Sequence, residues 1–372
     1  MNNPFSLEIN TENRIYGLDV FRAVAILLVV LTHGGFLLTG PLAHFPWIRI
    51  IDGVELFFVL SGFLIGSILI KTIERDGRLT FNSLTTFWKR RWFRTLPNYY
   101  LILLLNFLFV SFGFINGDLD KADYHFLFFL QNFSTPLTGF FWESWSLSIE
   151  EWFYIFFPVL SFVILLKMPL KKGMLLVIII LLLTPLLYRI HLSSEHLNAF
   201  WWDTKIRKMV LTRMDTIIYG VLAAYIKFYY DNFWKKYRYF YFILGVAIVY
   251  SLIYIIPTEP NAFFTKTFYF SVLSFGIMLL LPLAESVKNF RSRLGKIVTQ
   301  ISVISYSMYL INLALVAQVI KKHFPPESFW DGLMKYAIFW VIVIGASILL
   351  YKYFEKPMMD LRDYKKKKTS NI

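Results

Sequence analysis

Long apolar runs recur along this chain and limit the folds that it can adopt. About ten of them are long enough to cross a bilayer, because a transmembrane helix needs about 20 mostly apolar residues. Charged residues make up only 17% of the chain, whereas soluble domains contain about 25%. We therefore predict an all-α fold, a polytopic membrane helix bundle with about ten transmembrane helices. The predicted spans are 18–38, 53–70, 97–115, 149–167, 174–191, 212–230, 238–256, 266–284, 301–320 and 334–354.

The rest of the chain indicates no second folding unit. We expect one integral membrane domain over residues 1–372, with a short N-terminal segment to about residue 14 and a basic C-terminal tail at about 358–372. Segment 124–133 is apolar but too short to cross, so we expect it to be re-entrant or interfacial. Segment 196–208 is ambiguous in the same way.

The residues present exclude several kinds of chemistry. The chain has no cysteine, which excludes disulfides, thiolate metal sites and a cysteine nucleophile. It has no HExxH motif, P-loop or dinucleotide fingerprint, so we expect no bound metal and no nucleotide-driven transport. The net charge of +14 does not predict nucleic-acid binding, since membrane proteins gather lysine and arginine in cytoplasmic loops.

Alternate loops are rich in lysine and arginine, and this pattern predicts the orientation. The basic loops are 71–96, 167–172, 227–238 and 288–296, and the tail adds Lys365 to Lys368. Because cations favour the cytoplasmic side, we expect both termini in the cytoplasm. The exception is the stretch 189–213, whose cations fall on the outer side. That stretch is either a solvated loop or a site for an anionic acceptor.

His33 lies within the first apolar run, where an ionisable side chain is costly and by default suggests a functional site. Arg22 is eleven residues earlier on the same predicted helix, a rise of roughly 16 Å. At about 100° per residue the two side chains differ by roughly 20° in direction and share a face. One stripe of this helix therefore joins a cation near the cytoplasmic side to an imidazole in the outer half of the membrane.

Arg91 and Arg94 lie in KRRWFRTLP, residues 89–97, just before a predicted span. Their i, i+3 spacing puts them on one helical face, and two guanidiniums on one face suit a phosphate group. An ordinary membrane anchor is the alternative. Arg22 is predicted on the same side of the membrane, which favours the phosphate site.

Two neighbouring carboxylates, Glu150 and Glu151, begin the fourth span. They are roughly 100° apart on a helix, so we expect only one of them to face the bundle interior. Ser146, Glu150 and Tyr154 form one stripe at i, i+4 and i+8. A carboxylate at the depth of His33 would fix its tautomer and raise its basicity, as a general-base pair requires. The alternative is that both glutamates are interfacial.

Further charged residues begin other spans. Glu55 lies near the start of the second span, and Arg213 and Asp215 begin the sixth, where we expect them to neutralise each other. Asp19 is expected to cap its helix or to pair with Arg22.

Taken in order, these elements resemble the acyltransferase-3 family of integral membrane acyltransferases. Each element alone is weakly specific, but the ordered set covers nearly the whole chain and is highly specific. The elements are GLDVFRAVAILLVVLTH at 17–33, GVELFFVLSGFLIG at 53–66, RRWFRTLPNYY at 90–100, SWSLSIEEWFYIFFP at 144–158, RMDTIIYG at 213–220, ISYSMYLINLAL at 304–315 and FEKP at 354–357.

The resemblance implies about ten core helices, an acyl-coenzyme A donor that enters from the cytoplasm, and O-acylation of an extracytoplasmic glycan. It implies that His33 is the catalytic base, that Arg91 and Arg94 form the family's RxxR pair on the donor, and that Glu150 is its acid. This chain has Asn312 where many members have histidine. Asparagine does not carry a proton near neutral pH, so the role of a second histidine does not transfer.

The leading hypothesis is an acetyl-CoA-dependent O-acetyltransferase of a bacterial inner or cytoplasmic membrane. The donor phosphates would bind Arg22, Arg91 and Arg94, and an acceptor hydroxyl would lose its proton to His33, oriented by Glu150. A covalent acyl-histidine stays open, and the oxyanion stabiliser is open among Ser146, Trp145 and Asn312. The acceptor is open among lipopolysaccharide O-antigen, capsule, peptidoglycan, exopolysaccharide and a lipid-linked sugar.

The main alternative is a proton-coupled membrane carrier or exporter of a glycan or small metabolite. In that case His33 and the glutamates would relay protons. Carriers commonly show paired halves with interrupted helices, and no corresponding pair is evident in this sequence.

Overall fold

The computed structural model describes residues 14–40, 51–289 and 292–369. All regular secondary structure in this part of the chain is helical. Within it, nine helices are long and apolar enough to cross a membrane, and a tenth results if the bent pair Ala199–Arg207 and Val210–Tyr229 is counted as one span. The prediction of a polytopic bundle of about ten spans is confirmed, and the chain is a multi-pass membrane protein.

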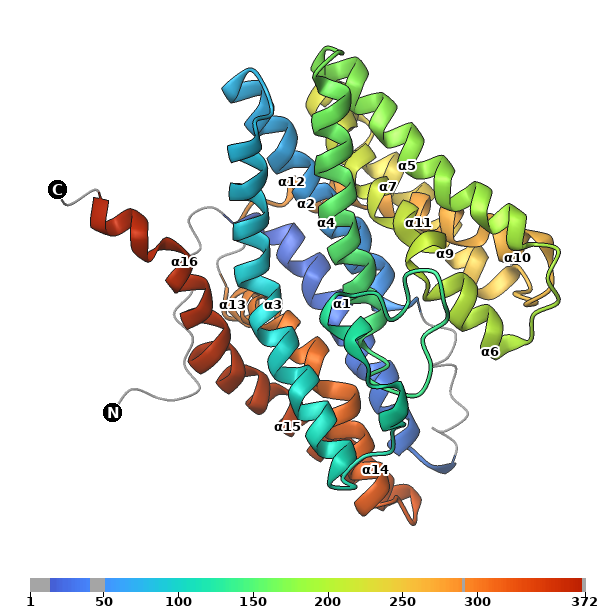
Figure 1. The fold of residues 1–372 in the computed structure, drawn as a ribbon. Helices are drawn as coiled ribbons and strands as arrows, with labels where there is room; N and C mark the ends of the chain where they lie inside the picture. The colour runs from blue at the N-terminus through green and yellow to red at the C-terminus, as the bar shows by residue number, and fades with distance from the viewer. Residues whose placement is uncertain (1–13, 41–50, 290–291, 370–372) are drawn as a thin grey trace.

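Figure 1 shows the helices in chain order from blue to red. Short π-helical turns continue several of them, and the longest is η8 (Asn312–Gln318). The α-helices are α1 (Tyr16–Gly34), α2 (Gly53–Asp76), α3 (Phe81–Ser111), α4 (Ser144–Leu165), α5 (Leu170–Leu192), α6 (Ala199–Trp202), α7 (Val210–Tyr229), α8 (Asp231–Lys236), α9 (Arg238–Tyr250), α10 (Phe263–Thr267), α11 (Tyr269–Met278), α12 (Leu281–Ser286), α13 (Arg293–Ile311), α14 (Val319–His323), α15 (Phe329–Leu350) and α16 (Lys356–Thr369).

The third helix begins much earlier than the hydropathy of the sequence indicates. We predicted a span from residue 97, but α3 begins at Phe81. Thr80 caps it, because its hydroxyl accepts a hydrogen bond from the Ser83 N–H at 3.1 Å. Pro97 is accommodated inside the helix. Charged residues before the apolar run therefore belong to the same rigid helix.

The short or ambiguous segments do not form straight spans of their own. Segment 124–133 contains only the 3₁₀ turn η5 (Tyr124–Leu127) followed by turns. Segment 196–208 contains α6 and a π-helical turn, and it is bent by 56° relative to α7. The predicted basic tail is helical in α16 as far as Thr369, whereas most of the predicted N-terminal segment lies outside the described residues.

The centre of the bundle is the contact between α2 and α7. Gly62 and Gly220 allow this contact, since a Cβ on either would collide with the backbone of the other helix, at 1.8 Å from the Ile217 oxygen or 2.0 Å from the Val59 oxygen. Small residues are the usual means of close helix packing in membranes. α1 packs against α2 and α13, and α5 packs against α7. Figure 1 shows α5, α7, α9 and α11 on one side of α2, and α13 to α16 on the other side of α1.

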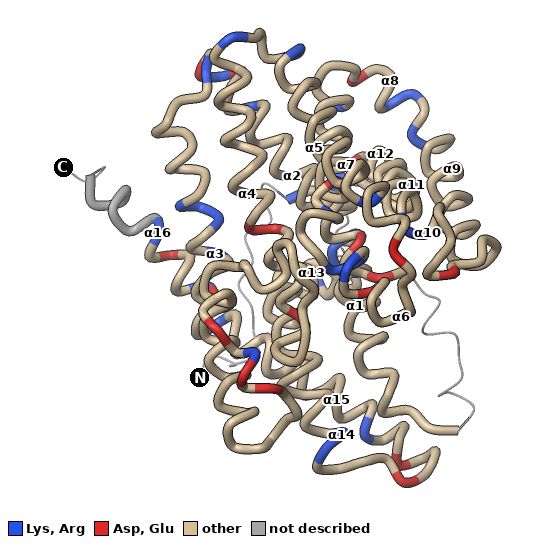
Figure 2. Tube along the Cα trace, turned by 45° about the vertical axis from the view of Figure 1, so that its right-hand side comes forward, with Lys and Arg blue, Asp and Glu red and all other residues tan. Residues whose placement is uncertain are grey.

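Lysine and arginine gather at one end of the bundle. We call this the basic end, and it comprises the connecting segments 71–80, 165–171, 227–238 and 285–289. Figure 2 shows blue segments at this end, around α8 and the loops that precede α3 and α5. The N-terminus of α1 is tied there, because the Gly17 N–H donates to the Val287 carbonyl at 2.9 Å. α1 therefore runs from the basic end toward the opposite end, with Arg22 before His33.

Candidate functional site

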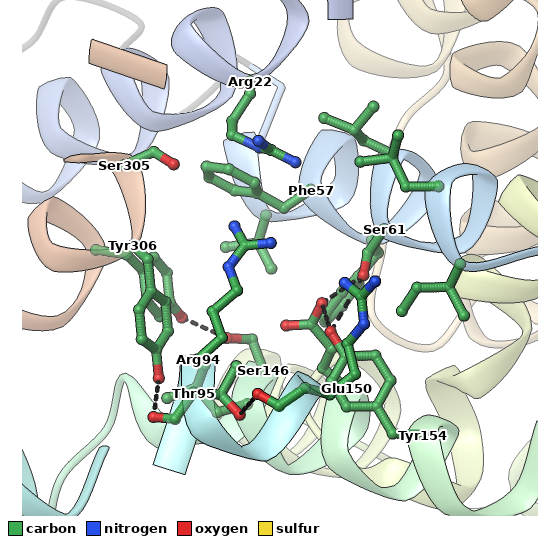
Figure 3. A pocket seen from close by; sticks show the side chains of 18 residues that line it. Arg22, Phe57, Ser61, Arg94, Thr95, Ser146, Glu150, Tyr154, Ser305 and Tyr306 are labelled. Carbon is green, nitrogen blue, oxygen red and sulfur yellow. Dashed lines mark hydrogen bonds between the residues drawn. The ribbon is translucent and has the colours of Figure 1, made fainter. Parts of the chain in front are cut away.

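A cavity opens between α1, α2, α3, α4 and α13. It holds about 820 Å³ of empty space, part of it open to solvent. α2 supplies an apolar wall that includes Phe57, Leu60 and Leu64. The other walls are polar, and Figure 3 shows Arg22 and Arg94 pointing toward the cavity from different helices. We call this space the arginine cavity.

Arg22, Arg91 and Arg94 line the arginine cavity and also a second opening, where Arg14 and Arg362 join them. In the described part of the chain, none of the first three forms an ion pair with an acidic side chain. The buried Arg91 Nε also has no hydrogen-bond partner there. The side chains of Arg22, Arg91 and Arg94 are therefore available to an anion that enters from the basic end.

The positions of these arginines follow from the helices that carry them. Because α3 is continuous from Phe81, Arg91 and Arg94 are held one turn apart on a rigid face rather than in a loop. Arg22 lies in the second turn of α1 and faces the same space. The structure thus brings the three predicted donor-binding arginines together in one cavity, and their binding of a donor stays a prediction.

Glu150 lies in the same cavity and contacts hydroxyl groups. Its Oε1 accepts a hydrogen bond from the Tyr154 hydroxyl at 2.6 Å and another from the Ser61 hydroxyl. Ser146, Glu150 and Tyr154 all line the cavity, as the predicted stripe requires. The predicted contact between Glu150 and His33 is wrong, because α4 begins at Ser144 and carries Glu150 into the arginine cavity.

Glu151 is buried and also faces inward, so the expectation that only one of the two glutamates faces the bundle interior is wrong. Its Oε1 accepts from the Thr95 hydroxyl at 2.7 Å, and its Oε2 accepts from the Trp92 Nε1 at 3.1 Å. Both partners are on α3, so α3 covers the side of α4 that carries Glu151. Glu151 therefore joins α4 to α3.

His33 lies in a different cavity, toward the opposite end of the bundle. This outer cleft holds about 1700 Å³, including open solvent, and its lining includes Thr32, His33, Asp52, Trp202 and Arg207. It shares no lining residue with the arginine cavity.

Asn312 is the partner of His33. The His33 Nδ1 lies 2.6 Å from the Asn312 Oδ1, and the Asn312 side chain is completely buried. Asn312 begins the π-helical turn η8, and such turns often occur at functional sites. The sequence named Asn312 as a departure from the family pattern and as one candidate oxyanion stabiliser, but not as the group that contacts His33.

Charged groups in the outer cleft neutralise one another. Arg207 pairs with Asp52 and with Asp203, and Lys208 lies 2.5 Å from the Asp203 carboxylate. Burial alone would raise the pKa of Asp52, but the Arg207 guanidinium and the Val54 N–H hold that pKa below its usual value. The cleft therefore presents paired rather than free cations beside His33.

A layer of hydrogen-bonded residues lies between the two cavities. The Ser146 and Tyr309 hydroxyls, which line the arginine cavity, are 2.6 Å apart. The Tyr309 backbone carbonyl accepts from the Asn312 Nδ2 at 2.8 Å. Tyr309 thus connects the arginine cavity to the group that holds His33, and sequence reasoning missed it because tyrosine is common in this chain.

Comparison with known proteins places this arrangement in a family. A family model described as an acyltransferase domain matches residues 15–352. The chain belongs to the acyltransferase-3 family. The matched range contains every residue of both cavities that the sequence singled out.

Relatives of this acyltransferase-3 protein carry names that refer to O-acetyl transfer. It is 27% identical to "Putative O-acetyltransferase SACOL0978" of Staphylococcus aureus (strain COL), over 92% of this chain and 57% of that protein. It is 23% identical to "O-acetyltransferase OatA" of Staphylococcus aureus (strain NCTC 8325 / PS 47), over the same shares of the two chains. The chain thus spans little more than half the length of these relatives.

Two charged residues of the acyltransferase-3 chain have partners other than those expected. Asp19 pairs with Arg14 and accepts from the Ser302 hydroxyl at 2.7 Å, so it is not the ion-pair partner of Arg22. This pair fixes the start of α1 to α13, and within the described residues Arg22 forms no ion pair with an acid.

The sequence predicted that Arg213 and Asp215 pair with each other, but both pair with residues on other helices. Arg213 lies 2.6 Å from the Glu55 carboxylate of α2, whereas Asp215 lies 2.7 Å from Arg189 of α5. Both arginines are fully buried. Within the stretch 189–213 these two arginines are therefore not solvated. Every lysine and arginine of the stretch pairs with an acidic side chain of the described residues, Lys205 with Glu195 among them, rather than being left free for an anionic acceptor. Within the described residues, no group of three or more histidine or acidic side chains is arranged to hold a metal ion.

Proposed function

We propose that this protein is a membrane O-acetyltransferase that moves an acyl group from acyl-coenzyme A to a hydroxyl of a cell-surface glycan. The observation that carries the proposal is a set of three arginines in one cavity, Arg22, Arg91 and Arg94, that form no ion pair with an acidic side chain of the described residues. An unpaired charge is costly where it is partly buried, so this cluster of three half-buried arginines favours an anionic ligand. The diphosphate and the 3′-phosphate of coenzyme A supply such charges, and planar guanidiniums bind phosphate with paired hydrogen bonds.

The shape of the arginine cavity supports the same donor. From the opening lined by Arg14 and Arg362, the space continues past the arginines to Ser146 and Tyr309. Its α2 wall is apolar, which suits the flexible thiol arm of coenzyme A. We place the basic end in the cytoplasm, where acyl-coenzyme A is made, and the outer cleft on the extracytoplasmic side of a bacterial cytoplasmic membrane.

His33 is proposed as the catalytic base at the outer cleft. The acceptor hydroxyl gives its proton to His33 while its oxygen forms a bond to the thioester carbonyl carbon. The carbon–sulfur bond then breaks, and the thiolate of coenzyme A takes the proton from His33. The products are an O-acyl ester and free coenzyme A, so no further reactant is needed. The thioester must pass the layer at Tyr309 to reach this point, since the two cavities share no lining residue.

The proposal is tested by transfer from labelled acetyl-coenzyme A to glycan with purified protein in lipid nanodiscs. Because the chain has no cysteine, every thiol that appears in the assay comes from coenzyme A. We expect glycan-dependent thiol release and label on the glycan. His33→Ala abolishes both, and Arg78→Gln, a change to an exposed arginine of the α2–α3 loop, leaves both unchanged.

Two results would contradict the proposal. Thiol release and glycan labelling by His33→Ala at the wild-type rate would remove His33 as the base. Movement of a glycan or metabolite across proteoliposomes without any thiol release would indicate a carrier instead.

A further inference from the structure

The orientation of the Asn312 side chain is determined by its own hydrogen bonds. Its Nδ2 donates to the Met308 carbonyl and to the Tyr309 carbonyl, each at 2.8 Å. Both carbonyls are acceptors only, so a flipped amide would place an oxygen against two oxygens. The amide oxygen must therefore be the atom that faces His33.

That orientation determines which ring nitrogen of His33 carries a proton. The Asn312 Oδ1 is an acceptor and lies 2.6 Å from the His33 Nδ1. A hydrogen bond at this distance requires Nδ1–H as the donor. In the neutral ring the other nitrogen, Nε2, then has the free lone pair. Within the described residues Nε2 has no hydrogen-bond partner, and His33 lines the outer cleft.

We propose that Asn312 is a positioning residue that holds His33 as the Nδ1–H tautomer, so that Nε2 is the atom that takes the proton of the acceptor hydroxyl. This inference rests on the proposed function for its chemistry, but the tautomer itself is independent of it. Asn312 acts through His33 and does not contact the reacting atoms.

The neutrality of Asn312 has a chemical consequence. A carboxylate at this position would stabilise the imidazolium and keep the proton on His33. The amide oxygen orients the ring but offers only a dipole, so His33 returns the proton readily to the departing thiolate. The cost of burying the amide is offset by its three hydrogen bonds to the protein.

Other titratable groups lie near the His33 ring, and their effect on its titration must be separated from the effect of Asn312. Asp52, Arg207 and Lys208 act on His33 electrostatically from the start of α2 and from the segment before α7. Near the ring, the Tyr336 hydroxyl of α15 donates to the Leu31 carbonyl, and the Tyr309 carbonyl of α13 accepts from Asn312. Glu143, beside η8, accepts from the Ala314 N–H, and burial raises the pKa of its carboxyl to about 7. The Glu143→Gln variant therefore tests whether a feature of the pH profile comes from Glu143 and not from His33.

The first test measures the tautomer without substrate. Protein labelled with ¹⁵N-histidine in nanodiscs gives ring-nitrogen shifts, and His33→Ala identifies the His33 signals. We expect a protonated Nδ1 and an unprotonated Nε2 in neutral His33 of the wild type. A protonated Nε2 in the wild type would overturn the inference whether or not the protein transfers acyl groups.

The second test measures the pH profile of acyl transfer. Asn312→Asp should move the acid limb of kcat/KM to higher pH by about one unit or more, because a carboxylate favours the imidazolium. Asn312→Leu should lower kcat at least about tenfold, since the ring loses its fixed tautomer. Asn106→Leu is the matched control: Asn106 is equally buried and donates to the Ile102 carbonyl at 2.9 Å, but it does not contact His33. We expect it to leave the pH profile unchanged.

Failure of the positioning role and failure of the proposed function give different results in these tests. An acid limb that stays in place in Asn312→Asp, with a thermal transition like that of the wild type, would contradict the positioning role. Absence of transfer in the wild type would contradict the proposed function while leaving the tautomer test valid.

Discussion

The Arg213 guanidinium lies 2.6 Å from the Glu55 carboxylate on a different helix, although Asp215 is only two residues away in the chain. Arg213 also donates to the Thr216 hydroxyl at 3.0 Å and lies over the Phe270 ring at 3.6 Å from its centroid. Residues i and i+2 point to different sides of a helix, so Asp215 turns to α5 and Arg213 to α2. The two buried pairs together hold α2 and α5 against α7.

Removal of one partner should destabilise the bundle strongly. We expect Glu55→Ala to lower the free energy of unfolding by about 3–5 kcal/mol, because a buried guanidinium is left unpaired. The double variant Glu55→Leu with Arg213→Met should recover most of that loss. Unfolding in sodium dodecyl sulfate, followed by tryptophan fluorescence, measures both. The control is Lys235→Ala, which breaks an exposed pair with Asp231 and should cause no change.

Loss of a cavity arginine should weaken binding of the donor through its phosphates. We expect Arg94→Gln to raise the KM for acetyl-coenzyme A about 10- to 100-fold, the value of one or two charge-assisted hydrogen bonds. The same variant should use acetyl-pantetheine, which lacks phosphates, as well as the wild type does. An equal loss with both donors would show that Arg94 does not contact phosphate.

Glu150 should act on the donor side and not on His33. Its carboxylate offsets part of the positive charge of the cavity arginines, so Glu150→Gln should strengthen binding of the donor phosphates and lower the KM for acetyl-coenzyme A by up to about tenfold. Because Glu150 contacts Ser61 and Tyr154, the acid limb of the pH profile should stay in place. A shift of that limb as large as the one expected for Asn312→Asp would restore the pairing of Glu150 with His33.

The absence of cysteine allows a clean test of orientation. Single cysteines are introduced as Asn82→Cys at the start of α3 and as Ser194→Cys after α5, both at exposed positions. With a membrane-impermeant maleimide we expect Ser194→Cys to react in intact cells and Asn82→Cys to react only after permeabilisation. The reverse pattern would place the arginine cavity on the extracytoplasmic side and exclude cytoplasmic acyl-coenzyme A as its ligand.

The sequence predicted well those features that depend on neighbours along one helix. The spacing of Arg91 and Arg94 determines that they share a face, and the stripe of Ser146, Glu150 and Tyr154 does the same on α4. These relationships hold wherever the helices pack, because 3.6 residues per turn is a local property.

Partners across helices could not be predicted in this way. Hydropathy placed the start of α3 near residue 97, since the amphipathic stretch from Phe81 carries too many charges to appear as a span. The same lack of long-range information led to the wrong pairing of Glu150 with His33 and of Asp19 with Arg22.

The sequence by itself determined that this is a membrane bundle, which family it resembles and which side chains are costly enough in a membrane to be functional. Only the tertiary structure decided that Arg22 and His33, on one helix, belong to two separate cavities, and that Asn312 rather than Glu150 holds the imidazole. The physical reason is that helix geometry is set by local hydrogen bonds, whereas the partner of a buried polar group is set by which distant helix packs against it.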